Sequence, residues 1–176
     1  VVLIEVGGTV GEYESILFIE AIRMMKSETP DDIGVVMVSY LPVPGSVGEM
    51  KTKPTQHAAR TLSASGVFAD LILARSTVPV DAKRREKIAR FCNVRPENVI
   101  SAPNVESIYD IPLNFEKYHL SDRLCDMLKL PCTQKSDLSE WKRFVSKSKN
   151  TVINNPPRRK AQPQRTQHYQ RSHQPL

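Results

Sequence analysis

Short apolar runs alternate with longer segments of helical periodicity along the N-terminal part of the chain. The runs lie at 1–6, 34–41, 68–74 and 98–102, and the helical segments lie at about 13–26, 55–64 and 81–91. Strands that are separated by helices of about ten residues or more form βαβ units, which build parallel sheets with right-handed crossovers. We therefore predict an α/β fold with a parallel sheet and helices on both faces, in which residues 1–6 form a central strand that is buried on both sides.

The C-terminal part of the chain differs in composition. Two further helices are predicted at 119–130 and 137–149. Beyond Asn150 the apolar pattern stops, and the mixture of Gln, Pro and Arg cannot bury enough surface to fold. We expect one domain at 1–150 and a disordered basic tail at 151–176.

Most of the positive charge lies in that tail. Residues 151–176 hold five basic and no acidic residues, so the predicted domain is nearly neutral although the formal net charge of the chain is +6. A nucleic acid would therefore have to bind the tail, whose short Arg-Arg-Lys run is only a weak signal of nucleic-acid binding. A nucleic acid is the least favoured of the partners considered. No apolar run approaches the roughly 20 residues of a membrane span, so no membrane partner is expected.

Three cysteines, Cys92, Cys125 and Cys132, are odd in number and lack the spacing of metal ligands. This pattern is typical of reduced thiols that pack as small apolar residues. The first residues also lack the basic start and the cleavage site of a secretory signal. We expect a cytoplasmic location.

The segment 48–57 carries the strongest candidate for a binding site. Lys51 and Lys53 precede Pro54, and a proline disfavours the helical conformation in the residue before it, so we expect an extended loop whose two ammonium groups point the same way. The helix predicted from Thr55 adds unpaired N–H groups at its N-terminus. This combination predicts an anion site sized for a polyphosphate. The alternative is a solvated Lys-x-Lys pair ahead of a surface helix.

The loops that follow the predicted strands should gather at one edge of the sheet. Ligands of parallel sheets bind beyond the carboxyl ends of the strands. The loops concerned lie at 5–14, 51–56, 74–80 and 102–106. Their expected position favours one shared site.

Three acidic residues near the N-terminus are further candidates. Glu5 ends the first predicted strand, where an ionised carboxylate is costly unless it is paired, and where α/β proteins that hydrolyse nucleotides hold Mg²⁺; alternatively it reaches solvent. Glu12 and Glu14 open the first predicted helix, where acids interact favourably with the helix dipole or accept hydrogen bonds from a sugar or a base. The basic segment 83–87 would usually be a solvated helix face, although one of its cations can reach toward a phosphate.

Four segments of the chain together resemble the CTP synthase family. They read Glu-Val-Gly-Gly-Thr-Val-Gly-Glu-Tyr-Glu-Ser at 5–15, Gly-Glu-Met-Lys-Thr-Lys-Pro-Thr-Gln-His at 48–57, Lys-Ile-Ala-Arg-Phe-Cys-Asn-Val at 87–94 and Ser-Ile-Tyr at 107–109. The resemblance covers about residues 1–150, which correspond to the latter part of that family's synthetase domain.

The resemblance implies a ligase that aminates UTP to CTP in pyrimidine nucleotide biosynthesis, with ATP and Mg²⁺, and with glutamine or ammonia as the nitrogen donor. It also implies a separate glutaminase domain and a homotetramer when the protein is full length. No catalytic residue is assigned. Carried over motif by motif, the implied contacts are Glu5 to the metal; Lys51, Thr52, Lys53, Pro54, Thr55, Gln56 and Lys87 to UTP and CTP; Glu12, Tyr13 and Glu14 to the inhibitor CTP; and Pro103, Asn104 and Val105 to ATP.

Several features depart from the family pattern. Glu12 stands where the family usually has aspartate, and Pro103-Asn104 stands where it commonly has Lys-Asp. No Gly-Lys pair occurs in the sequence, so it does not contain the Gly-rich phosphate loop that opens the family's domain. We expect a partial P-loop-type synthetase domain, a fragment that is inactive alone and leaves a sheet edge exposed. The alternative is a non-catalytic nucleotide-binding or oligomerisation module.

Overall fold

The computed structural model describes residues 1–45, 48–131 and 137–154. The predicted tail from residue 155 onward therefore lies outside the described residues. Its first residues, 151–154, belong to the last helix of the chain.

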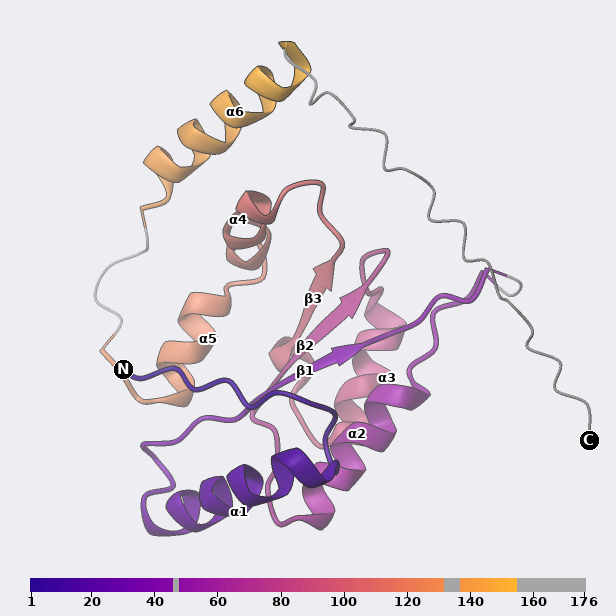
Figure 1. The fold of residues 1–176 in the computed structure, drawn as a ribbon, viewed down its shortest axis with the longest axis vertical. Coiled ribbons are helices and arrows are strands. Elements are labelled where there is room, and N and C mark those ends of the chain that lie inside the picture. Colours follow the sequence, from indigo (N-terminus) through magenta and orange to yellow (C-terminus); the bar gives the residue numbers. More distant parts are fainter. Residues whose placement is uncertain (46–47, 132–136, 155–176) are drawn as a thin grey trace, which may run out of the picture.

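Three parallel strands in the order β1-β2-β3 form the central sheet (Figure 1). They are β1 (Val36–Tyr40), β2 (Leu71–Ser76) and β3 (Val99–Pro103). Each strand coincides with one of the predicted apolar runs, shifted by at most a few residues, and all pairing is parallel. The predicted α/β fold with a parallel sheet is confirmed.

Helices connect the strands, and some of them cover the sheet. They are α1 (Tyr13–Glu28), α2 (Lys53–Ala64), α3 (Ala82–Cys92), α4 (Ile111–Glu116), α5 (Leu120–Met127) and α6 (Ser139–Asn154), with two 3-10 turns, η1 (Pro96–Asn98) and η2 (Ile108–Asp110). In Figure 1, α2 and α3 lie together beside the sheet, and α4 and α5 lie on the side of β3. The core between them contains Leu41, Leu71, Ile72, Ile88 and Ile100, which are fully buried. No helix in these described ranges is both long and apolar enough to cross a membrane.

One face of the sheet is covered only toward β3. On β1, Val38 and Tyr40 are 62% and 53% exposed, whereas Ile100, which is aligned with Val38 across the sheet, is 1% exposed. No strand pairs with the outer side of β1 in the part of the chain that the structure describes. Parallel sheets are normally covered on both faces, so β1 is the exposed edge expected from the sequence.

The prediction of a strand at residues 1–6 is wrong. This segment lies outside the sheet, and its first four side chains are exposed, from 76% for Ile4 to 89% for Leu3. A strand needs a neighbour that pairs with its backbone N–H and C=O groups. An apolar run indicates a preference for burial, but it does not supply that neighbour, and in the described residues β1 pairs with β2 alone.

Asp81, the first residue of the helical segment expected at 81–91, is the N-cap of α3. Its Oδ1 accepts a hydrogen bond from the Arg84 backbone N–H at 2.8 Å, and its Oδ2 pairs with the Arg84 guanidinium. The backbone hydrogen bond, followed by the guanidinium, holds the pKa of Asp81 below its ordinary value of 3.8. The stabilisation is therefore complete above the unfolded pKa and is lost as the pH falls through the lowered folded pKa.

We expect Asp81→Ala to lower the free energy of unfolding by about 1 kcal/mol at neutral pH, because loss of an N-cap typically costs this much. Denaturant unfolding measures the difference. Asp81→Asn keeps an acceptor for the Arg84 N–H and should retain most of the stability. An equal loss in both variants would show that the cap is not the cause.

Candidate functional site

The loops that follow the three strands are tied together at the carboxyl edge of the sheet. The Lys51 N–H donates to the carbonyl of Pro42 at 2.9 Å, and the Asn104 N–H donates to the carbonyl of Ser76 at 2.8 Å. The Ser76 hydroxyl in turn donates to the carbonyl of Leu41 at 3.2 Å. The structure thus brings three of the four predicted loops to one edge.

The lysine loop leads directly into α2. This helix begins at Lys53, with Thr52 as its N-cap in a helical conformation (φ −96°, ψ −10°). The extended conformation predicted for Lys53 is therefore wrong. Pro54 falls in the first helical turn, where no N–H is required, so the helix tolerates the proline and overrides its effect on the preceding residue. The two lysines consequently do not share one side of an extended strand.

Buried polar side chains fix the start of α2. The Thr55 side chain is fully buried, and its hydroxyl lies 2.9 Å from the hydroxyl of Ser39 on β1. The Gln56 amide donates to Thr52 Oγ1 at 3.0 Å, and both residues are buried. These three predicted binding residues therefore position the loop with their side chains. Their side chains are therefore not free to bind a ligand in this conformation.

The N-termini of α2 and α3 differ. Among the described residues, no side-chain cap hydrogen bond forms at Thr52, the N-cap of α2, whereas the Asp81 side chain caps α3. Pro54 has no N–H, and the Gln56 N–H donates to the Thr52 carbonyl, so bonding within the helix leaves the N–H groups of Lys53 and Thr55 unpaired. The helix dipole adds partial positive charge at this end. Together with Lys51 and the exposed Lys53, this end of α2 is an anion-binding arrangement.

Two residues that the sequence analysis did not single out adjoin the lysine loop. Glu49 accepts hydrogen bonds from the Lys51 ammonium at 3.0 Å and from the Arg84 guanidinium at 3.2 Å. The hydrogen bond from Lys51, then its charge and that of Arg84, hold the pKa of Glu49 below its ordinary value. Two features of the sequence could have indicated these residues: Glu49 lies within the lysine segment 48–57, and Arg84 lies within the basic segment 83–87. Lys87, the residue of that segment that the family resemblance implies as a nucleotide contact, lies exposed on α3.

The candidates for the inhibitor, residues 12–14, lie exposed at the start of α1. Glu12 takes the N-cap position, and its Oε2 accepts a hydrogen bond from the Thr9 N–H at 3.2 Å. A methyl group on Gly11 would lie 2.6 Å from Cγ2 of Thr61, so the start of α1 packs against the second half of α2. Thr61 is about 12 Å along the helix from its first residue. The structure does not bring these residues to the lysine loop.

Glu5 lies in the exposed N-terminal segment. The described ranges contain no group of three or more His, Cys, Asp or Glu side chains that could hold a metal ion. Mg²⁺ on a nucleotide is usually bound by one or two carboxylates, with phosphates and water as the other ligands. Glu5 is one such carboxylate, and its assignment to the metal stays a prediction.

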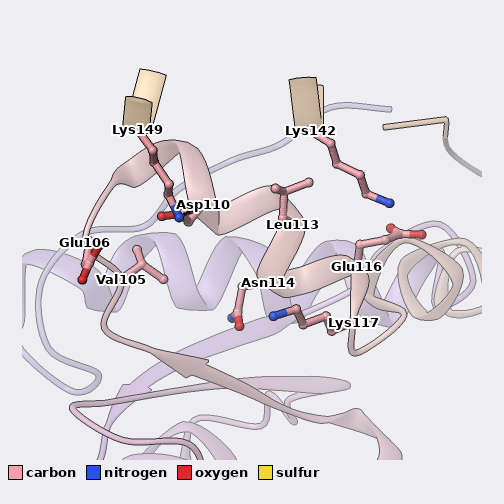
Figure 2. Close-up of a pocket in the computed structure, with 9 residues that line it drawn as sticks. All are labelled: Val105, Glu106, Asp110, Leu113, Asn114, Glu116, Lys117, Lys142 and Lys149. Atoms are coloured by element: carbon pink, nitrogen blue, oxygen red, sulfur yellow. Dashed lines mark ion pairs between the residues drawn. The ribbon is translucent and has the colours of Figure 1, made fainter. Parts of the chain in front are cut away.

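Of the predicted ATP contacts, Val105 lines a cavity of about 640 Å³. Figure 2 shows Lys142 and Lys149 reaching from α6 toward η2 and α4. Lys149 pairs with Asp110 at 2.8 Å, so this ion pair joins α6 to η2. The other lining residues are Glu106, Leu113, Asn114, Glu116 and Lys117. The cavity thus combines side chains of both charges with the apolar side chains of Val105 and Leu113. Pro103 and Asn104 lie at the end of β3 and do not line it.

The cysteines only partly match the expectation of reduced thiols. Cys92 is free and buried, and burial raises its pKa to about 11, so the thiol stays protonated at neutral pH and is not a nucleophile. Cys125 is disulfide-bonded, so the expectation is wrong for this residue. An odd number of cysteines in a chain still allows a disulfide bond to form. Cys132 lies outside the described residues.

The fold and the site together define an α/β protein with a parallel sheet, whose carboxyl edge carries a lysine loop and an uncapped helix N-terminus suited to phosphate groups. More specifically, the chain belongs to the CTP synthase family. The family model described as "CTP synthase N-terminus" matches residues 1–130.

Curated relatives support the same assignment. The CTP synthase of Halalkalibacterium halodurans is 43% identical over 155 residues, and that of Caldanaerobacter subterraneus subsp. tengcongensis is 44% identical over 151 residues. Each alignment covers 85% of this chain and 28% of the relative. The archaeal CTP synthase of Methanothermobacter thermautotrophicus is 41% identical over 146 residues, which cover 82% of this chain and 27% of the relative. The chain therefore spans little more than a quarter of the length of these relatives.

Proposed function

We propose that this chain carries the part of a CTP synthase that binds the triphosphates of UTP and CTP. The observation that carries the proposal is the uncapped N-terminus of α2 with Lys51 before it and Lys53 in its first turn. A triphosphate offers several anionic oxygens, and lysine ammonium groups and backbone N–H groups are suited to donate to them. The buried hydrogen bond between Thr55 and Ser39 supports the proposal because it fixes this end of α2 against the sheet.

Within a complete enzyme, the proposal extends to a ligase that aminates UTP to CTP in pyrimidine nucleotide biosynthesis. ATP and glutamine or ammonia would be its co-substrates, with Mg²⁺ as the nucleotide-bound ion. Lys87 would approach the same triphosphate from α3, residues 103–105 would contact ATP, and residues 12–14 would contact the inhibitor CTP. A glutaminase domain, assembly as a homotetramer and a cytoplasmic location follow from the same family resemblance.

A second candidate is a non-catalytic module that binds nucleotides or supports oligomerisation. The observation that favours it is the absence of any Gly-Lys pair from the 176-residue sequence, because lysine-bearing, glycine-rich loops hold the phosphates of ATP in P-loop proteins. Both candidates require the triphosphate site, and they differ in whether turnover occurs.

We expect UTP and CTP to compete for binding to the full chain, because both would place a triphosphate on the same lysines. In displacement calorimetry, the apparent Kd of UTP should rise in proportion to the concentration of CTP. Arg60→Ala removes a positive charge from an exposed position farther along α2 and should leave both affinities unchanged. Simultaneous binding of the two nucleotides would show two separate sites and contradict the shared site.

A further inference from the structure

The candidate anion site contains a carboxylate of its own. Glu49 lies two residues before Lys51, and its Oε2 accepts a hydrogen bond from the Lys51 ammonium at 3.0 Å. A carboxylate oxygen and a phosphate oxygen are both anionic acceptors, so they compete for the same ammonium group. A polyphosphate that approaches Lys51 also meets the negative charge of Glu49 at short range.

Arg84 holds the same carboxylate from another side. One of its terminal nitrogens donates to Glu49 Oε1 at 3.2 Å, and its Nε donates to the Met50 carbonyl at 3.2 Å. The remaining terminal nitrogen pairs with Asp81 at the start of α3. The Arg84 side chain is 27% exposed, against 58% for Glu49, so the guanidinium is the more enclosed member of the pair. A single planar group thus connects α3 to the residues just before Lys51.

We propose that the Glu49 carboxylate competes with a bound polyphosphate for the Lys51 ammonium group. When the polyphosphate displaces this carboxylate from Lys51, Arg84 keeps the carboxylate paired. The inference rests on the proposed function, since it requires a polyphosphate on Lys51. Each oxygen of Glu49 has its own cation in the ligand-free chain. Release of Lys51 therefore leaves the carboxylate paired with Arg84. Without Arg84, the carboxylate would have Lys51 as its remaining partner and would oppose the ligand more strongly.

The test is a double-mutant cycle in the full chain, with the affinity for UTP as the readout. Glu49→Gln keeps the size of the side chain and removes its charge, and we expect UTP to bind about threefold to tenfold more tightly. Arg84→Ala should lower the affinity for UTP about tenfold in the native background and less than about threefold in the Glu49→Gln background. Arg90→Ala removes an exposed charge from the last turn of α3 and should change neither affinity.

The outcomes separate the inference from the proposed function. The inference is overturned if Arg84→Ala lowers the affinity for UTP equally in both backgrounds, or if Glu49→Gln does not raise it. In either case, a loss of UTP affinity in Lys51→Ala would still support the proposed function. If UTP does not bind, or if Lys51→Ala leaves its affinity unchanged, the proposed function fails and the inference fails with it. Should Arg84→Ala not fold, Arg84→Gln takes its place in the cycle, because it removes the same charge and keeps a longer side chain.

Discussion

Lys51→Ala is expected to weaken the binding of UTP and CTP to this chain by about tenfold to a hundredfold, because each charge-assisted contact contributes roughly 1.5–3 kcal/mol. The factor should be the same for both nucleotides, since they differ in the base and share the triphosphate. Isothermal titration of the full chain at fixed ionic strength measures both affinities, because contacts of this kind are weakened by salt.

Arg60→Ala is the matched control for this comparison, because it removes an equal charge from an exposed position in the second half of α2. It should leave both affinities within error of the unaltered chain. If Lys51→Ala lowered the affinity for UTP and left the affinity for CTP unchanged, the two triphosphates would not share a site.

The chain by itself is expected to form no detectable CTP from UTP, ATP, Mg²⁺ and free ammonia. Phosphoryl transfer depends on backbone N–H groups, a lysine and Mg²⁺ that together hold and stabilise the transferred phosphoryl group. The given sequence contains no Gly-Lys pair, so the lysine-bearing loop that holds the phosphates of ATP in P-loop proteins does not occur in it. Because groups that act as a unit lose activity together, we expect the activity to be absent rather than reduced in proportion.

Free ammonia replaces the product of a glutaminase, so the assay depends on the synthetase reaction alone. A full-length relative such as the CTP synthase of Halalkalibacterium halodurans serves as the positive control under identical conditions. CTP formation by the highly purified chain would contradict the prediction, and it would also exclude the second candidate, the non-catalytic module. Nucleotide binding without turnover would agree with both.

The sequence predicted the sheet wherever a run of apolar residues had a partner within the chain. The runs that became β1, β2 and β3 pair with one another, and the hydrophobic pattern located each of them. Residues 1–6 have the same pattern, but no strand pairs with them in the part of the chain that the structure describes, so the prediction failed there. Periodicity reports which residues favour burial, whereas pairing depends on the rest of the fold.

The candidate site could be predicted in part for a similar reason. Local signals located the lysine loop, the start of α2 near Pro54 and the start of α3 near residue 81. The pairing of Glu49 with Arg84 joins residues that are 35 positions apart, and no local pattern indicates it. Burial of Thr55 against β1 likewise depends on tertiary packing, so the sequence could not show that its side chain is unavailable to a ligand.

The most direct test of the triphosphate site is to map where CTP binds, using backbone amide chemical shifts of the ¹⁵N-labelled chain. We predict that the largest shifts occur at Lys51, Lys53 and Thr55, at the uncapped start of α2, and that Lys51→Ala abolishes them at the same CTP concentration. Shifts centred on the cavity lined by Val105, with the start of α2 unchanged, would contradict the assignment of this site.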